Sequence, residues 1–233
     1  MRHDHCLAVE VDATRRLPIV QIIGVGLNYV GHAREQGVPI PERPLLFTKN
    51  PAAACLHGDS IVVPKLCQDR DQVDYEGELA VLIGKPARDV PVEHALDFVL
   101  GYCCANDVSA RWWQKEGSGR QFFRGKSFDT FCPLGPGVVP AGEVGDPNAL
   151  RLRTTVNGET CQEAHTSNMI FSVSQLISEI SRGLTLVPGT VILTGTPAGV
   201  GFARTPPRFL RDGDVVRVEI DKLGVLENGV RFE

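Results

Sequence analysis

The chain of 233 residues is 42% hydrophobic and 22% charged, which is ordinary for a soluble globular protein and suits one large domain or two small ones. Its formal net charge of −4 argues against a nucleic-acid partner and against binding to an anionic membrane surface. No apolar run approaches the roughly 20 residues that a membrane-spanning helix needs. We therefore predict neither a nucleic-acid partner nor a membrane partner.

Seven cysteines are scattered along the chain without a repeating spacing, and two of them, Cys103 and Cys104, are adjacent. An odd and irregular set of this kind favours reduced thiols over a disulfide framework. The first residues lack the apolar core of a signal peptide, and they contain acidic residues early, unlike a transit peptide. We therefore expect a cytoplasmic protein.

Short apolar runs, many of them β-branched, predict strands along most of the chain. The clearest hairpin has residues 151–156 and 159–162 on either side of Asn157-Gly158, because Asn-Gly pairs favour tight turns between strands. The other predicted strands cover residues 19–25, 45–49, 61–64, 79–84, 99–105, 190–194 and 215–220.

Helices are fewer and shorter, with predictions at residues 29–36 and 92–98 and a clear one at 173–182. The last has apolar residues at helical spacing, a capping box from Ser172 and Gln175, and Gly183 as a stop. Many strands with few helices indicate a mainly β (α+β) fold. We expect residues 1–18 to form a peripheral segment and residues 19–233 to form a single domain.

The stretch Asp74-Tyr75-Glu76-Gly77-Glu78 leads directly into an apolar run that reads as a buried strand. Side chains two apart on a strand share a face, so Glu76 and Glu78 are expected to lie close together. Two ionised carboxylates about 4 Å apart repel by roughly 4 kcal/mol at an effective dielectric constant near 20. Protonation, exposure to water or a bound cation would each relieve that repulsion.

Asp107 follows another apolar strand, as the glutamates precede theirs. Three carboxylates at strand ends suit a hard cation that prefers oxygen ligands, such as Mg²⁺ or Mn²⁺. Two other interpretations stay open from the residues alone. The glutamates would also fit a solvated strand end, and Asp107 or Asn106 would also serve as the N-cap of a helical turn over residues 108–115.

Five stretches of the chain occur in the order found in the fumarylacetoacetate hydrolase family, which the chain resembles from about residue 20 to residue 230. They are Gly26–Tyr29 with His32 and Glu35, Asp74–Ala80, Asn106–Arg111, Gly125–Phe131 with Pro133–Pro136, and Thr194–Gly201. Within the family, residues 127–136 and 206–214 are most similar to the branch called domain-containing protein 2. No single one of these motifs is specific to the family, but the five together are.

The resemblance implies a layered β-sandwich roll with a few short helices and a homodimer. It also implies a Mg²⁺ ion, with Mn²⁺ or Ca²⁺ as alternatives, and roles for three groups of residues. The implied metal ligands are Glu76, Glu78 and Asp107. The implied catalytic residues are His32 and Glu35, a water-activating dyad on a mobile segment, and Lys126, which stabilises enolate charge. The implied substrate-binding residues are Arg111, Gln114 and Thr196.

Such a site implies a small 2-oxo acid as the substrate, because three protein ligands leave about three positions of an octahedral ion for its carboxylate and keto oxygens. We predict a hydrolase that cleaves the carbon–carbon bond of acylpyruvates through a metal-chelated pyruvate enolate. Decarboxylation or tautomerisation of oxaloacetate, or isomerisation of a 2-hydroxymuconate-type acid, is the alternative at the same metal. A binding protein for 2-oxo acids that lacks catalysis is a third hypothesis. Fumarylacetoacetase itself has a further acidic ligand with no match here, which argues for a different substrate.

Overall fold

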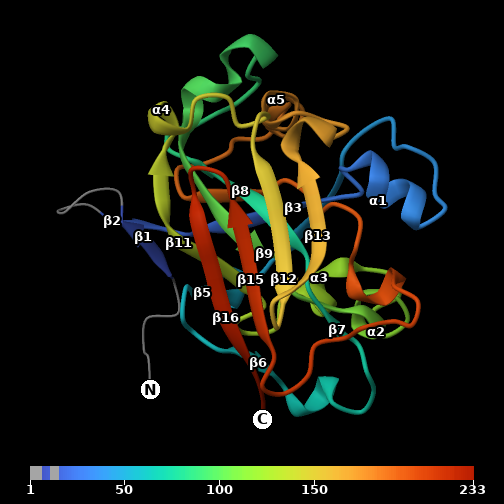
Figure 1. The fold of residues 1–233 in the computed structure, drawn as a ribbon. Coiled ribbons are helices and arrows are strands. Elements are labelled where there is room, and N and C mark those ends of the chain that lie inside the picture. Colours follow the sequence, from blue (N-terminus) through green and yellow to red (C-terminus); the bar gives the residue numbers. More distant parts are fainter. Residues whose placement is uncertain (1–6, 11–15) are drawn as a thin grey trace.

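The computed structural model describes residues 7–10 and 16–233, and two β-sheets form its body (Figure 1). The larger sheet has seven strands, in spatial order β4 (Leu45–Lys49), β3 (Gln21–Gly26), β14 (Thr190–Leu193), β8 (Gly77–Ile83), β9 (Val99–Asn106), β11 (Cys132–Pro140) and β5 (Ala54–Leu56). The smaller sheet has five, in the order β13 (Glu159–His165), β12 (Arg151–Val156), β15 (Val215–Ile220), β16 (Gly224–Phe232) and β6 (Ile61–Val63).

Two short strand pairs and several short helices complete the described chain. The pairs are β1 (Ala8–Glu10) with β2 (Arg16–Pro18), and β7 (Val73–Asp74) with β10 (Ser109–Ala110). The α-helices are α1 (Val30–Glu35), α2 (Arg111–Gln114), α3 (Phe122–Lys126), α4 (Ala141–Val144) and α5 (Val173–Ser181). The 3₁₀ helices are η1 (Pro51–Ala53), η2 (Lys65–Cys67), η3 (Val92–Phe98), η4 (Thr166–Asn168) and η5 (Gly201–Ala203).

All residues of strand β8 are buried. Successive side chains of a strand point to opposite sides, so β8 is buried on both faces. One face, including Leu79 and Val81, contributes to the main core, which also contains apolar residues of α5 and of the smaller sheet. The other face, with Ala80 and Leu82, contributes to a second core on the far side of the larger sheet. The apolar run after Glu78 is therefore the central strand of the molecule.

The mainly β fold predicted from the sequence is confirmed, and so are the Asn157-Gly158 hairpin and the helix that begins after the Ser172–Gln175 capping box. Gly183 has a φ of 71° just past the end of α5, as expected of a stop. None of the helices in the described residues combines the length and apolar character needed to cross a bilayer. The six cysteines within the described ranges are free thiols.

The division at residue 18 stays a prediction. Residues 1–6 and 11–15 of the predicted peripheral segment lie outside the described residues. In the part that is described, Leu7 and Leu17 pack against the second core, and the N–H of Ile19 donates to the carbonyl of Leu7 at 2.8 Å. This part of the segment is thus attached to the larger sheet.

Two details of the acidic region differ from the sequence interpretation. Strand β8 begins at Gly77, so Glu76 lies just before it, although its carboxylate lies close to that of Glu78, as predicted. Neither Asn106 nor Asp107 caps a helix, since the N-cap of α2 is Ala110 and no side chain caps it. The Asn106 and Asp107 side chains point instead to groups around Glu76, as described below.

The antiparallel pairing of β8 with β9 brings the acidic residues together. Gly77 lies opposite Asn106 in the register. The N–H of Asp107 donates to the carbonyl of Glu76 at 2.8 Å, and the N–H of Glu76 donates to Asn106 Oδ1 at 3.0 Å. Figure 1 shows α1, α2 and α3 on the same side of the sheets, at the right of the view, and residues of all three line the pocket described next.

Candidate active site

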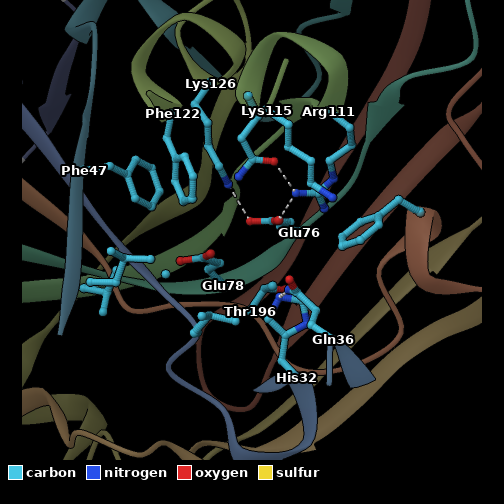
Figure 2. A pocket seen from close by; sticks show the side chains of 16 residues that line it. His32, Gln36, Phe47, Glu76, Glu78, Arg111, Lys115, Phe122, Lys126 and Thr196 are labelled. Carbon is cyan, nitrogen blue, oxygen red and sulfur yellow. Dashed lines mark hydrogen bonds and ion pairs between the residues drawn. The ribbon is translucent and has the colours of Figure 1, made fainter. Parts of the chain in front are cut away.

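The carboxylates of Glu76, Glu78 and Asp107 form a buried cluster, and each has an oxygen within 4.8 Å of the others. Glu76 comes from the segment before β8, Glu78 from β8 itself and Asp107 from the position directly after β9. Figure 2 shows the side chain of Glu76 at the centre of the pocket with Glu78 beside it. The structure therefore brings together the three residues that the resemblance implied as metal ligands.

Three buried cations contact this cluster. Lys126 Nζ lies 2.7 Å from Glu76 Oε2 and 2.6 Å from Asp107 Oδ2. Arg111 Nη1 lies 2.6 Å from Glu76 Oε1. Lys49 Nζ donates to Asp107 Oδ1 and, at 2.7 Å, to the carbonyl of Phe131. Because both oxygens of Asp107 are engaged by lysines, this carboxylate is held in one orientation.

The two glutamates have opposite electrostatic environments. Burial alone would raise the pKa of Glu76, but the charges of Lys126 and Arg111 outweigh it and lower that pKa to about 2. Burial raises the pKa of Glu78 well above its ordinary value, and the negative charges of Asp107 and Glu76 raise it further. Glu78 is therefore the carboxylate whose negative charge most needs a further cation beside it.

These residues fit a divalent ion by their chemistry. The donor set consists of three carboxylates within the described chain, without a thiol or imidazole, which is the set that Mg²⁺ and Mn²⁺ prefer. A divalent cation would also compensate the repulsion that raises the pKa of Glu78. The group can therefore hold a hard divalent ion.

The loop from Thr194 to Phe202 organises the site through its backbone N–H groups. Gly195 donates to Glu78 Oε2 at 2.7 Å, and Gly199 donates to Glu35 Oε1 at 2.8 Å. Gly201 and Phe202 donate to the two carboxylate oxygens of Asp74, at 2.7 and 3.1 Å. One glycine-rich loop thus binds three carboxylates that come from separate parts of the chain.

Gly199 is required by both its conformation and its surroundings. Its φ is 103°, a value that residues with a Cβ atom rarely adopt, and an added Cβ would lie 2.0 Å from the carbonyl oxygen of Cys161. This backbone conformation presents the N–H of Gly199 to Glu35. Helix α1 is therefore fixed to the loop at the residue that also orients His32.

His32 is buried in α1 and makes two side-chain contacts. Its Nδ1 lies 3.1 Å from Glu35 Oε2, and its Nε2 lies 2.7 Å from the Nε2 of Gln36. An ionised carboxylate only accepts hydrogen bonds, so in the neutral ring Nδ1 carries the hydrogen and Nε2 accepts one from the Gln36 amide. The lone pair of Nε2 therefore accepts a hydrogen bond from Gln36, which has to be released before Nε2 can take a proton from a substrate. Figure 2 shows His32 across the pocket from Lys126 and Arg111.

The predicted substrate-binding residues all border the pocket, but their side chains already have partners. Arg111 donates from Nε and Nη2 to Asp74 Oδ2, at 2.9 and 2.7 Å, and from Nη1 to Gln114 Oε1 at 3.0 Å. The hydroxyl of Thr196 donates to the carbonyl of Gly77 at 3.0 Å and accepts from Gln162 at 2.7 Å. Asp74 and Gln162 therefore hold these residues in place.

The sequence interpretation missed two buried charges. Asp74 stands in the acidic motif, yet its partner is Arg111, 37 positions away, and the carboxylate is fully buried. Lys49 ends strand β4 and is bound to Asp107, 58 positions away. One indication of a buried charge was present in the sequence, namely Lys49 itself, a charged residue at the end of an apolar strand.

The pocket around these groups has a volume of about 100 Å³, far below the several hundred of sites for drug-sized ligands. Two predicted site residues do not line it: Glu35, which is exposed, and Asp107, which is fully buried. The other predicted site residues do, together with Val25, Gly26, Leu27, Gln36, Leu45, Phe47, Lys115, Phe122 and Phe202. A space of this size fits a small acid.

The chain matches the family model for the fumarylacetoacetate (FAA) hydrolase C-terminal region over residues 21–231. It therefore belongs to the fumarylacetoacetate hydrolase family, as its motifs predict. Oxaloacetate tautomerase fahd2 of Xenopus laevis, described as mitochondrial, is 47% identical to the chain over 210 residues. The match covers 90% of this chain and 65% of that protein, so the chain spans less than two thirds of its relative's length. That relative belongs to the branch indicated by residues 127–136 and 206–214.

Solved structures agree on the fold. Fumarylpyruvate hydrolase from Pseudomonas aeruginosa, in complex with Mn²⁺ and pyruvate, superposes with a TM-score of 0.88 at 31% identity, covering 100% of this chain and 99% of that one. A 5-carboxymethyl-2-hydroxymuconate delta-isomerase from Mycobacterium smegmatis superposes with a TM-score of 0.80 at 42% identity, covering 93% and 81% of the two chains. The family thus includes proteins named for three different reactions on small organic acids.

Proposed function

We propose that this protein is a divalent-metal enzyme that moves a proton at C3 of small 2-oxo acids, with keto–enol tautomerisation of oxaloacetate as its main reaction. The observation that carries the proposal is that His32, whose Nδ1 contacts Glu35, borders the same small pocket as Glu76 and Glu78. The 47% identity to an oxaloacetate tautomerase supports the choice of substrate.

Each group has a distinct task in this proposal. A divalent ion held by Glu76, Glu78 and Asp107 would polarise the keto group of the substrate and acidify its C3 hydrogen. The Mn²⁺ and pyruvate named in the Pseudomonas aeruginosa structure support this assignment, with Mg²⁺ as the ion we expect. Lys126 keeps a positive charge beside the carboxylates, and Arg111 is held at the pocket wall by Asp74.

The proton moves within the site and none is gained or lost. His32 Nε2 takes the proton from C3 of the keto form and returns it to the oxygen at C2, which yields the enol. While the imidazole is protonated, Glu35 stabilises its positive charge, because their contact becomes an ion pair. The reverse sequence converts the enol to the keto form. His32 and Glu35 are therefore the acid–base pair of the proposed reaction.

Hydrolysis of acylpyruvates, the reaction predicted from the sequence, is the second candidate. The superposition on fumarylpyruvate hydrolase over the whole of this chain favours it. In that reaction His32 would take a proton from water, and the water would attack the carbonyl carbon at C4. The C3–C4 bond would then break to give a carboxylic acid and the enolate of pyruvate, which would take up the proton at C3. The two reactions share the pocket and differ in what His32 deprotonates.

The test is to measure both reactions with the same enzyme preparation in the presence of Mg²⁺. Tautomerisation is followed by the approach of freshly dissolved oxaloacetate to its keto–enol equilibrium, and hydrolysis by the loss of the diketo absorbance of an acylpyruvate. We expect the larger kcat/KM for oxaloacetate. A larger value for the acylpyruvate would make hydrolysis the main activity, and no turnover of either would contradict both candidate reactions.

Oxalate is expected to inhibit competitively in the presence of the metal. It is planar and presents two adjacent oxygens, like the carboxylate and enolate oxygens shared by every candidate substrate, and a mimic of that form binds more tightly than the substrate. Competition is measured from the dependence of the rate on oxaloacetate at several oxalate concentrations. Noncompetitive inhibition would place oxalate elsewhere and contradict the substrate orientation.

We also propose a homodimer, as the family resemblance implies. The adjacent tryptophans give little support, because Trp113 packs against Phe128 and Trp112 stacks with Arg70 within the chain. Better support comes from the edge strand β4, where Leu46, which lies outside the pocket lining, is 42% exposed. Light scattering at micromolar concentration is expected to give twice the chain mass, and the mass of one chain would refute the proposal.

The proposed partner is thus a small 2-oxo acid, and the proposed location is the cytoplasm. The free cysteines of the described chain support a reducing compartment. The Xenopus laevis relative is named as mitochondrial, so fractionation of cells that produce the protein would decide between the two compartments.

A further inference from the structure

One cation of the pocket is not used by the reaction described above. Three cationic side chains line the pocket, and two of them, Arg111 and Lys126, are bound to buried carboxylates. The third, Lys115, has an exposed side chain, and no carboxylate of the described chain pairs with its ammonium group. Its Nζ lies over the ring of Phe202, 4.4 Å from the ring centre. Lys115 is therefore a positive charge at the pocket that is free to bind an anion.

Lys115 is held close to the substrate-binding residues. It follows α2 directly, and its N–H donates to the carbonyls of Arg111 and Trp112, at 3.1 and 3.2 Å. The Arg111 guanidinium lies over the same Phe202 ring, 4.5 Å from its centre. Both cations thus share one aromatic surface, and Figure 2 shows Lys115 on the same side of the pocket as Arg111 and Lys126.

The backbone of Phe202 is held at the pocket wall by a hydrogen bond. Its N–H donates to Asp74 Oδ2 at 3.1 Å, and Asp74 is the buried partner of Arg111. The aromatic face attracts cations, so the ring restrains the flexible Lys115 side chain beside Arg111 without neutralising its charge. A ligand with its reactive end near Glu76 would therefore meet Lys115 at its other end.

The charges around the pocket indicate how many negative groups a ligand should carry. The buried carboxylates of Asp74, Glu76, Glu78 and Asp107 are opposed by the buried cations Lys49, Arg111 and Lys126. A divalent ion would leave the group with one positive charge, which matches one substrate carboxylate. Lys115 adds a second positive charge at the pocket, so the complete site matches a dianion.

We propose that Lys115 binds the distal carboxylate of the substrate and so selects 2-oxo dicarboxylic acids over 2-oxo acids with an uncharged end. The inference rests on the proposed function, because it assumes that the reactive end of the substrate lies at Glu76, Glu78 and Asp107. Lys115 is thus a specificity-determining residue that acts on the end of the substrate where no bond changes.

The first arm of the test is kinetic. Lys115→Met keeps most of the length of the unbranched side chain and removes its charge. It is expected to raise the KM for oxaloacetate about tenfold, the low end for loss of a hydrogen bond to a charged group. The kcat should change by less than about threefold. The contact with the distal carboxylate is equally strong in the bound substrate and in the transition state, so its loss weakens binding but does not slow the chemical step. Lys115→Arg should restore the KM, and inhibition by oxalate, which has no distal group, should be unchanged.

Lys85→Met is the matched control, since Lys85 is exposed and lies outside the pocket lining. An unchanged KM for oxaloacetate in Lys115→Met would overturn the inference. Equal weakening of oxaloacetate and oxalate would also overturn it, because Lys115 would then act on the whole site and not on the distal carboxylate.

The second arm measures binding without turnover, by calorimetry on the Mg²⁺-loaded protein with malate and lactate. These two acids share a 2-hydroxy acid end and differ in the distal carboxylate. The wild type should bind malate about tenfold more tightly than lactate, and Lys115→Met should lose that preference. A preference that survives in Lys115→Met contradicts the inference. Absence of oxaloacetate turnover in the wild type contradicts the proposed function alone, because the malate preference still tests Lys115.

Discussion

Glu78→Gln is expected to lower the metal-dependent turnover of oxaloacetate by about 10³-fold or more, because Lewis-acid assistance contributes several kcal/mol and each 1.4 kcal/mol changes a rate about tenfold. The metal-free protein should fold at least as stably as the wild type. Glutamine has the same shape, and its side-chain oxygen can still accept from the N–H of Gly195. The signature is therefore lost activity without lost stability.

The stability argument follows from the raised pKa of Glu78. Burial and the charges of Asp107 and Glu76 raise that pKa in the folded state, so ionised Glu78 destabilises the fold at pH values above it. The neutral amide of glutamine removes this penalty. Thermal unfolding with and without Mg²⁺ measures both effects: the wild type should gain stability with the ion, and Glu78→Gln should not.

Glu93→Gln is the control for this variant, since Glu93 is an exposed residue of η3 outside the pocket. It should keep both the activity and the stabilisation by Mg²⁺. If Glu78→Gln kept full activity and the same response to Mg²⁺, the three carboxylates would not be the metal site.

His32→Ala is expected to reduce tautomerisation of oxaloacetate, and any hydrolysis of acylpyruvates, by the 10²–10⁴-fold (about 3–5 kcal/mol) typical of lost general acid–base catalysis. Decarboxylation of oxaloacetate should fall much less, because the loss of CO₂ requires neither a base nor a nucleophile. The ratio of proton-transfer to decarboxylation rates, measured in the wild type and in the variant, isolates the role of the imidazole.

The chain offers a matched control for His32. His94 and Asp97 form another histidine–carboxylate pair, also three positions apart in the sequence, with 3.5 Å between His94 Nδ1 and Asp97 Oδ2. Both residues are exposed in η3. His94→Ala should change neither activity. Glu35→Gln should give an intermediate loss, since it keeps the ring orientation and removes the charge that stabilises imidazolium. Equal losses of proton transfer and decarboxylation in His32→Ala would contradict the role assigned to His32.

Many strands were predictable because their pattern is local, but β11 and β16 were not predicted, because prolines and glycines interrupt the first and Asn228-Gly229 lies within the second. Strand β8 was found from an apolar run, and β15 from the alternation of buried Val216 and Val218 with exposed Arg217 and Glu219. The exact start of β8 was not predictable. The backbone of Glu76 forms hydrogen bonds with Asn106 and Asp107, which lie about 30 positions further along the chain. Alternation in a sequence does not reveal where a long-range hydrogen bond ends a strand.

The site was predictable where chemistry and resemblance coincide, and not where charges pair over long distances. Three carboxylates at strand ends already suggested a cation. Nothing local to Lys49 or Asp74 shows that each is buried against a charge 58 or 37 positions away. The role of the glycine-rich loop was hidden for the same reason, because its N–H groups could be matched to Glu78, Glu35 and Asp74 only once the chain had folded.

The most direct test of the account is the rate of oxaloacetate tautomerisation in one wild-type sample before chelation, after exhaustive chelation, and after Mg²⁺ or Mn²⁺ is returned. Chelation should remove the enzymatic rate, and the returned ion should restore it, because Glu76, Glu78 and Asp107 are proposed to act only together with that ion. A tautomerisation rate that survives chelation unchanged would contradict the proposal that this carboxylate cluster is a catalytic metal centre.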